Sequence, residues 1–179
     1  MKKLVYLFLL AGIVTGQAQI IQLDEARVNA RAVKIIANGE DLKYVVLEDY
    51  SGQFLKNPIA FMKENFDIHP LIKQLKEKNY VSYLVEFRNS RGYLEAHFDR
   101  KGKLISTAQK FRDIPLPLSV SRELVTNHKG WTMKKSLYLA SGKGDAVDKE
   151  LYRITLKNGN STQNVKIIPA SPSRGLASN

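Results

Sequence analysis

Two stretches of this chain alternate between apolar and polar residues and contain tight turns, and this pattern constrains the fold more than any other feature. The first stretch runs from Val81 to Phe111, with turns at residues 88–92 and 99–102. A period of two residues is typical of a strand with one buried face, and short turns join such strands antiparallel. This stretch therefore predicts a meander of three antiparallel strands.

The same pattern returns in the C-terminal half of the chain. A strand is predicted at residues 131–139, followed by a glycine-rich connection at residues 141–148. Two more strands, at residues 151–156 and 162–168, flank the dipeptide Asn158-Gly159, which is common in hairpin turns. We therefore expect a second meander of three strands.

Two helices are predicted before the first meander. The first begins at Asn57-Pro58, because Asn caps a free backbone N–H and Pro at the first helical position loses no hydrogen bond. The second begins after Asp67, which can act as its cap. Both contain apolar residues at helical spacing. These are Ile59, Met62 and Phe66 in the first helix and Ile68, Leu71, Ile72 and Leu75 in the second.

One short helix is predicted before the second meander. Pro115 and Pro117 end the first meander, and Gly130 stops the helix that follows them. The apolar residues of this helix are Val120, Leu124 and Val125.

A unit of helix followed by three strands thus occurs twice, in residues 57–114 and in residues 115–168, at a spacing of about 60 residues. We predict an α+β fold, in which the two meanders form one sheet with helices packed on one face. The chain would then be a single domain built from two similar halves.

The ends of the chain are less regular. Residues 19–56 are expected to contain N-terminal strands, one at Ile20–Ile36 and another at Leu42–Leu47. The second of these strands would be closed by a turn at Asp49, Ser51 and Gly52. Residues 169–179 are polar and without periodicity, and we expect them to be a disordered tail.

The first eighteen residues predict export. Lys2 and Lys3 precede an apolar run from Leu4 to Val14, and Gly16-Gln17-Ala18 fits a signal-peptidase site with cleavage after Ala18. The alternative is a buried N-terminal helix. The run is shorter than the roughly 20 apolar residues that span a bilayer, so we expect no transmembrane anchor. The predicted location is periplasmic or secreted.

Charge and cysteine content narrow the chemistry. The chain of 179 residues has 28 Lys and Arg against 17 Asp and Glu, a formal net charge of +11, which suggests acidic partners. It has no cysteine, which excludes disulfides, thiolate metal sites and a cysteine nucleophile.

Several segments together resemble a known family. They are the FDRKG turn at residues 98–102, Leu116-Pro117, the KGW segment at residues 129–131, the YRITL strand at residues 152–156 and the Asn158-Gly159 turn. They resemble the PepSY-like family, also called β-lactamase-inhibitor-protein-like, of small exported proteins from Bacteroidetes-type bacteria, over about Tyr80 to Ile168. The resemblance implies a tandem helix-plus-sheet fold with a concave sheet face. Related inhibitors bind a partner enzyme with such a face, and PepSY domains are proposed to restrain peptidases. The shared positions are turn and core residues, so no inhibitory residue carries over.

No motif for catalysis or for a cofactor emerges. His97 and Asp99 share one face of a strand, a spacing that suits two metal ligands, but further ligands are not patterned nearby. The Ser141–Gly144 segment lacks the spacing of a phosphate-binding loop. Glu86 and Glu95 are expected to face each other on adjacent strands, with Arg88 or Arg91 to neutralise them. We predict a non-enzymatic protein with no metal and no cofactor.

The candidate binding residues are basic residues at the turns of the first meander and one aromatic beside them: Arg88, Arg91, Tyr93, Arg100 and Lys101. The leading hypothesis is a module that binds a protein or peptide of the cell envelope through its sheet face, with a role in regulating a peptidase or an envelope protein. The alternatives are a basic structural protein that binds anionic surface polymers, and an enzyme of unrecognised type. Export argues against nucleic acid as a partner. The same basic turns would also keep hairpins soluble and protect sheet edges.

Overall fold

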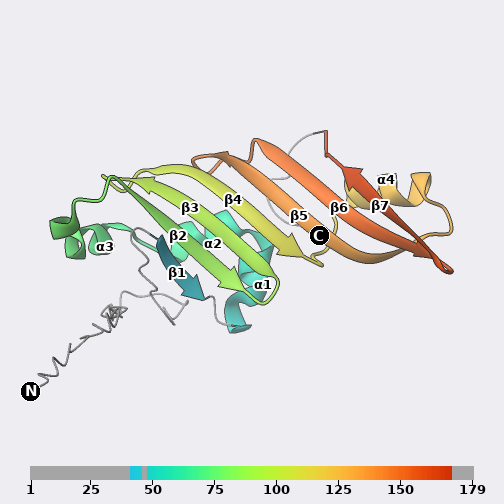
Figure 1. Cartoon of the computed structure of the whole chain (residues 1–179), viewed down its shortest axis with the longest axis horizontal. Coiled ribbons are helices and arrows are strands. Elements are labelled where there is room, and N and C mark those ends of the chain that lie inside the picture. The colour runs from blue at the N-terminus through green and yellow to red at the C-terminus, as the bar shows by residue number, and fades with distance from the viewer. Residues whose placement is uncertain (1–40, 46–47, 171–179) are drawn as a thin grey trace, which may run out of the picture.

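A seven-stranded sheet forms the body of the molecule in a computed structural model that describes residues 41–45 and 48–170 (Figure 1). The predicted signal peptide, the predicted strand at Ile20–Ile36 and most of the predicted tail lie outside these residues. The strands are β1 (Asp41–Val45), β2 (Ser82–Asn89), β3 (Gly92–Asp99), β4 (Leu104–Arg112), β5 (Thr132–Lys143), β6 (Lys149–Asn158) and β7 (Ser161–Ile167). Their order in the sheet is their order in the chain. β1 pairs with β2 in parallel, and all other neighbours are antiparallel.

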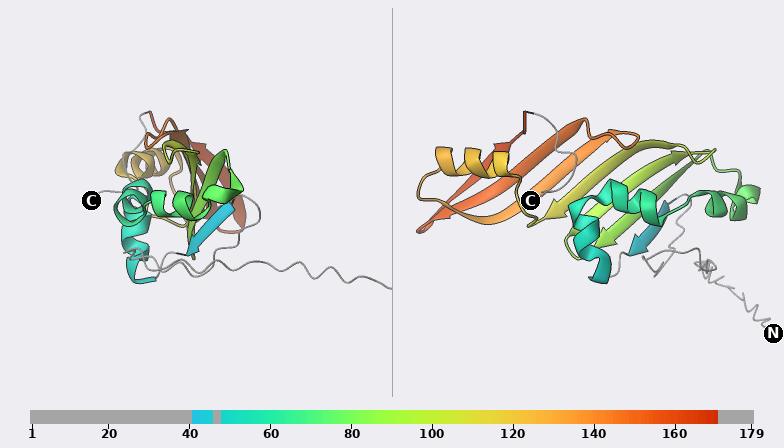
Figure 2. Two further views of the ribbon diagram at one scale, coloured as in Figure 1. Left: turned by 90° about the vertical axis from the view of Figure 1, so that its left-hand side faces the viewer. Right: turned by 180° about the vertical axis from the view of Figure 1, so that it is seen from behind.

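The described residues form four α-helices, of which α1, α2 and α4 lie on one face of this sheet and α3 lies at its end (Figure 2). They are α1 (Glu48–Lys56), α2 (Pro58–Asn65), α3 (His69–Gln74), which the short 3-10 helix η1 (Lys76–Lys78) follows, and α4 (Leu118–Asn127). In Figure 2, α1 and α2 lie over the first meander and α4 over the second. The predicted α+β fold, with two joined meanders and helices on one face, is confirmed. None of these helices is long and apolar enough to cross a membrane.

The two helices predicted before the first meander are α2 and α3, and both begin close to the predicted residues. Asn57 Oδ1 accepts a hydrogen bond from the backbone N–H of Ala60 at 3.1 Å, and Pro58 occupies the first turn of α2. Asp67 Oδ1 accepts the N–H of His69 at 3.0 Å, directly at the start of α3. Both side-chain oxygens satisfy a backbone donor that a helix start leaves without a partner, although the N-cap position of α3 is Ile68 and not the predicted Asp67.

One continuous core lies between the sheet and the helices and draws on both halves of the chain. α2 contributes Ile59, Phe61 and Met62, while α4 contributes Val120 and Leu124. The strands bury alternate residues against them, in agreement with the predicted period of two. These strand residues include Tyr83, Val85, Phe87, Leu94, Ala96, Phe98, Phe111, Tyr138, Tyr152, Ile154 and Leu156.

The predicted turn at Asp49, Ser51 and Gly52 is wrong, because these residues lie within α1. Phe54 of this helix is fully buried, with its ring centroid 5.4 Å from that of Phe61 and 5.5 Å from that of Phe111. Burial of one helix face outweighs the turn preference of Ser and Gly. The preceding strand prediction is confirmed by β1.

The glycine-rich connection between β5 and β6 is shorter than predicted, because β5 continues to Lys143. Its last residues pair with β4, with Ser106 opposite Lys143. The remaining connection folds back, so that the N–H of Gly144 donates to the carbonyl of Ile105 at 2.7 Å. Asp145 forms an ion pair with Lys63 of α2, which lowers the pKa of Asp145. Strand pairing and this ion pair join the two halves into one unit.

Candidate binding face

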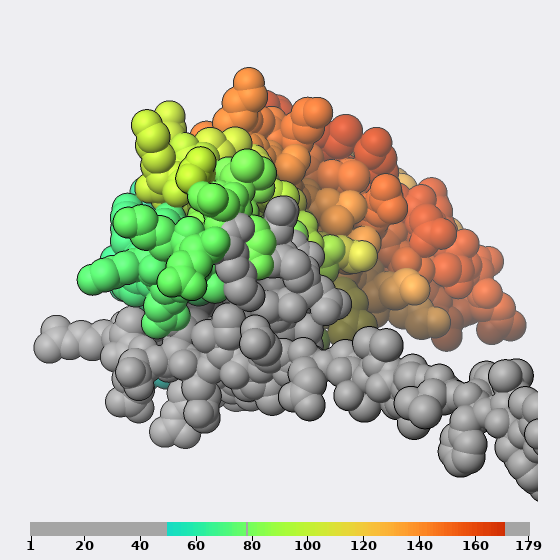
Figure 3. All heavy atoms as spheres, turned by 60° about the vertical axis from the view of Figure 1, so that its left-hand side comes forward, coloured from blue at the N-terminus to red at the C-terminus, as the bar shows by residue number. Residues whose placement is uncertain are grey.

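The face of the sheet opposite the helices is the candidate functional site, and we call it the open face. No described helix covers it, and strand register places its side chains in rows that run across several strands (Figure 1). The space-filling view shows the two halves as one continuous surface, green for the first meander and orange to red for the second (Figure 3). Residues far apart in the sequence therefore meet on this face.

An apolar hollow of about 620 Å³ lies at the middle of the open face, and we call it the central groove. Its floor includes Tyr93 of β3, Ala108 of β4, Leu139 of β5 and Leu151 of β6, and Ile168 stands at its rim. Leu139 lies directly opposite Leu151, and all four floor side chains are half-buried. Ile168 is 63% exposed. Partly exposed apolar side chains gathered in a hollow are characteristic of a binding surface.

Two of the predicted binding residues lie together beside this groove. The guanidinium carbon of Arg88 lies 4.8 Å from the ring centroid of Tyr93, a cation–π contact between opposite residues of the first hairpin. Arg88 Nε also donates to Glu86 Oε1 at 2.8 Å, and this hydrogen bond raises the pKa of Arg88. Glu86 is 6% exposed and lies directly opposite Glu95, as predicted. Arg88 therefore compensates a buried carboxylate and holds the aromatic ring in place.

The other predicted binding residues are dispersed. Arg91 lies in the turn between β2 and β3, and its Nη1 donates to the backbone carbonyl of Asp113 at 2.8 Å. Arg100 and Lys101 lie in the next turn, where Arg100 Nη2 donates to Asn79 Oδ1 at 2.8 Å. β3, with eight residues, separates the two turns by about 25 Å. The structure thus does not bring all five residues into one site.

Replacing Arg88 tests whether its guanidinium compensates the negative charge of the buried Glu86 carboxylate. Arg88→Gln is expected to lower the free energy of unfolding by about 1–2 kcal/mol, because a buried carboxylate loses its charged hydrogen-bond donor. Urea denaturation measures the effect, with the exposed Arg122→Gln on α4 as the matched control. Adding Glu86→Gln to Arg88→Gln should recover part of the loss. An Arg88→Gln variant as stable as the control would contradict the role assigned to Arg88.

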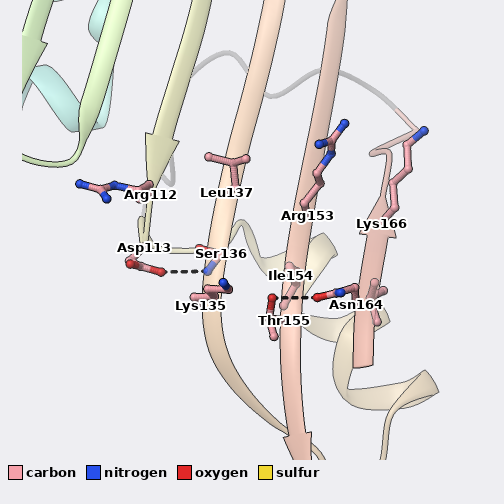
Figure 4. A pocket seen from close by; sticks show the side chains of 11 residues that line it. Arg112, Asp113, Lys135, Ser136, Leu137, Arg153, Ile154, Thr155, Asn164 and Lys166 are labelled. Atoms are coloured by element: carbon pink, nitrogen blue, oxygen red, sulfur yellow. Dashed lines mark hydrogen bonds between the residues drawn. The ribbon is translucent and has the colours of Figure 1, made fainter. Parts of the chain in front are cut away.

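A second hollow, of about 500 Å³, lies on the open face of the second half. Four cationic side chains from four neighbouring strands line it, and we call it the basic hollow: Arg112, Lys135, Arg153 and Lys166 (Figure 4). The one carboxylate in its lining, that of Asp113, accepts the N–H of Ser136 through Oδ1 at 2.8 Å. This cluster is not apparent from the sequence, because it depends on the register between strands of different hairpins.

Asp99, which the sequence pairs with His97 as a possible metal ligand, has a structural role in the sheet. Asp99 Oδ1 accepts the backbone N–H groups of Lys101 and Lys103, each at 2.8 Å, and so shapes the turn after β3. The side chain of His97 is exposed. Across residues 41–45 and 48–170, no three His, Asp or Glu side chains come together in a group that could hold a metal ion.

One buried pair of tyrosines lies on the helix side of β5 and β6. The rings of Tyr138 and Tyr152 are 5.0 Å apart between centroids, and the Tyr152 hydroxyl donates to Glu150 Oε1 at 2.9 Å. Burial and the nearby charge of Glu150 raise the pKa of Tyr138, so its phenol stays protonated at neutral pH. This polar cluster lies in the core and not on the open face.

Comparison of the chain with protein-family models, with curated proteins and with solved structures finds no match.

Proposed function

We propose that this protein is a non-enzymatic binding module that engages a polypeptide partner through the open face of its sheet. The observation that carries the proposal is the central groove, where Tyr93, Leu139 and Leu151 form an apolar floor that no helix of the described residues covers. Burial of such side chains by a partner is a main source of binding free energy.

The surroundings of the groove carry charges of both signs. Lys110, Lys149 and Lys166 line the groove together with Glu95, Asp148 and Glu150, and Arg88 lies against Tyr93 at its edge. An apolar centre bordered by charged groups is the usual anatomy of a protein interface, in which the rim sets orientation and the centre supplies affinity.

Export and a regulatory role are parts of this proposal. The N-terminal segment with the features of a signal peptide favours a partner in the cell envelope, such as a peptidase or an envelope protein. The resemblance to the PepSY-like family favours the same class of partner. Both arguments rest on the sequence, whereas the choice of the open face rests on the groove.

A second candidate function is attachment to anionic surface polymers. The observation that favours it is the basic hollow, whose lining contains four cationic side chains and one carboxylate. Attachment of this kind would depend on charge and would weaken steeply as salt screens it.

Site-specific photo-crosslinking in the native host tests the leading proposal. A photoreactive amino acid at Leu139 is expected to crosslink to one polypeptide, whereas the same amino acid at Val125 is not. Val125 is a suitable control because it is 69% exposed and lies on α4, across the sheet from the groove. Equal crosslinking from both positions would count against the open face.

The affinity of the crosslinked partner, once purified, gives the quantitative test. Leu139→Asp is expected to weaken binding by about 30-fold or more, as for a central contact worth about 2 kcal/mol, while Val125→Asp leaves it unchanged. Circular dichroism confirms that both variants fold. Binding that survives about 0.5 M salt supports the apolar groove, since salt at that level screens surface charges strongly. Binding of this partner that is lost at this salt and is unaffected by Leu139→Asp would contradict a role of the central groove.

A further inference from the structure

Two like charges face each other on the open face without a counter-ion from the described chain. Arg153 of β6 and Lys166 of β7 are directly opposite residues in an antiparallel pair. Among the described residues, no carboxylate oxygen lies within 4.0 Å of either cation. Like charges in opposite positions destabilise a sheet, because the Cβ atoms of such residues are only about 5 Å apart. The pair thus costs stability unless an anion binds to it.

The surroundings of this pair supply further positive charge and hydrogen-bond donors. Figure 4 shows Arg153 and Lys166 side by side on neighbouring strands, with Lys135 and Asn164 at the lower end of the same hollow. The Thr155 hydroxyl donates to Asn164 Oδ1 at 2.9 Å, which leaves the amide nitrogen of Asn164 as a donor toward a ligand. The polar groups of the lining are therefore mainly donors and cations, and they stand beside the apolar side chains of Leu137, Ile154 and Val165.

From this arrangement we infer that the basic hollow is a binding site for a phosphate group, held between Arg153 and Lys166. A phosphate monoester or inorganic phosphate carries a charge of about −1.5 to −2 at neutral pH, which compensates both members of the pair. A single carboxylate would compensate only one of them. Phosphate also presents oxygens in several directions, which suits a planar guanidinium and an ammonium that approach from neighbouring strands.

This site is separate from the apolar contacts that we propose for the polypeptide partner. The central groove binds through apolar contact at Leu139 and Leu151, whereas the basic hollow lies further along β6, two residues beyond Leu151. Lys166 lines both hollows, so a ligand in one would adjoin a ligand in the other. If phosphate does not bind, the crosslinking result at Leu139 is unaffected. If Leu139 does not crosslink to a polypeptide, the phosphate titration is equally unaffected.

Titration of the full chain with potassium phosphate tests the inference, with potassium acetate at matched ionic strength as the reference anion. Chemical shifts of backbone amides in β6 and β7 and the unfolding temperature are the two readouts. Phosphate should shift the amides near Arg153 and Lys166 and raise the unfolding temperature, because a ligand that binds the folded state stabilises it. Equal effects of acetate and phosphate would overturn the inference.

A pair of double variants separates a specific site from general charge. Arg153→Gln/Lys166→Gln is expected to weaken phosphate binding about tenfold or more, since it removes two charge-assisted hydrogen bonds. Arg122→Gln/Lys129→Gln removes the same charge from α4 and from the connection to β5, and it should leave phosphate binding intact. Equal losses in the two variants would show that net charge alone attracts the anion.

The source of the phosphate group is distinguished with vesicles. Phosphatidylcholine vesicles that contain a minority of phosphatidic acid present the same group on a lipid headgroup. Binding to these vesicles, lost in Arg153→Gln/Lys166→Gln, would identify a headgroup as the ligand, whereas binding of inorganic phosphate alone would identify a soluble ligand. Binding of neither probe overturns the inference.

Discussion

Phe54→Ala is expected to lower the free energy of unfolding by about 3–5 kcal/mol, the largest effect that we predict for a single substitution in the core. Phe54 is fully buried and makes edge-to-face contacts with Phe61 of α2 and Phe111 of β4. Truncation would remove the apolar area and leave a cavity between two helices and the sheet. Partial collapse of α1 would fill little of this cavity, because the rings around it are themselves close-packed.

Urea denaturation followed by the fluorescence of Trp131, the only tryptophan of the chain, measures this effect. Trp131 is half-buried and packs against the same core, so it reports on unfolding in the second half of the sheet. Val125→Ala is the control, since Val125 is exposed on α4 and its truncation should cost less than about 0.5 kcal/mol. A loss below about 1 kcal/mol for Phe54→Ala would show that α1 does not pack on this core.

Gly142→Ala is expected to destabilise the protein by about 3 kcal/mol through a steric clash. A Cβ atom at Gly142 would lie 1.9 Å from the carbonyl oxygen of Ala146 and 2.8 Å from the backbone nitrogen of Asp148. Both are backbone atoms of the connection that folds back between β5 and β6, so no side-chain rotation can relieve the overlap. The connection must move away from β5, and overpacking of this kind is costly.

Gly52→Ala is the matched control for this clash, because it is the same substitution with the opposite expected sign. A Cβ atom at Gly52 meets nothing within 4 Å, and the residue lies inside α1. Alanine should raise the free energy of unfolding there by about 0.5–1 kcal/mol, through helix propensity and a less flexible unfolded chain. Thermal unfolding of both variants checks the contrast. Similar behaviour of the two variants would contradict the close approach at Gly142.

The meanders could be predicted from the sequence because their determinants are local. The alternation of apolar and polar residues determines which face of each strand is buried. The side chains of the turn residues form hydrogen bonds within their own turns. Asn89 Oδ1 accepts the N–H of Arg91 at 2.9 Å, and Asp99 does the same for Lys101. Gly159 adopts a φ of 55°, a left-handed value that explains the Asn-Gly turn before β7. The helix starts at Asn57 and Asp67 were predictable for the same reason.

Helix α1 could not be predicted in this way because it depends on contacts distant in the sequence. Its segment contains Ser51 and Gly52, which favour a turn when only neighbours are considered. Phe54 is buried by Phe111, and the Ser51 hydroxyl accepts a hydrogen bond from Asn89 Nδ2 at 2.8 Å. Both partners belong to the first meander, so the helix is favoured only once that meander is in place.

Only the part of the candidate site that lies within one hairpin could be predicted from the sequence. Arg88 and Tyr93 form the second residue pair from a two-residue turn, which places them opposite each other. Arg100 and Lys101 lie at the far end because successive turns of a meander alternate between the two ends of its strands. The basic hollow combines strands β4 to β7, and the position of each cation depends on three separate registers that composition does not reveal.

The strands follow one another in the sheet in the same order as in the chain, and this has a consequence for how the molecule folds. From β2 to β7 each strand pairs with the one that follows it in the chain, so hairpins can form one after another while the rest of the polypeptide is still emerging. Such topologies have short average contact distances along the chain and fold quickly for their size. The exception is β1, which pairs in parallel with β2 across an intervening segment of three helices. We expect closure of that loop to be the slowest step of folding, with the rest of the sheet already formed.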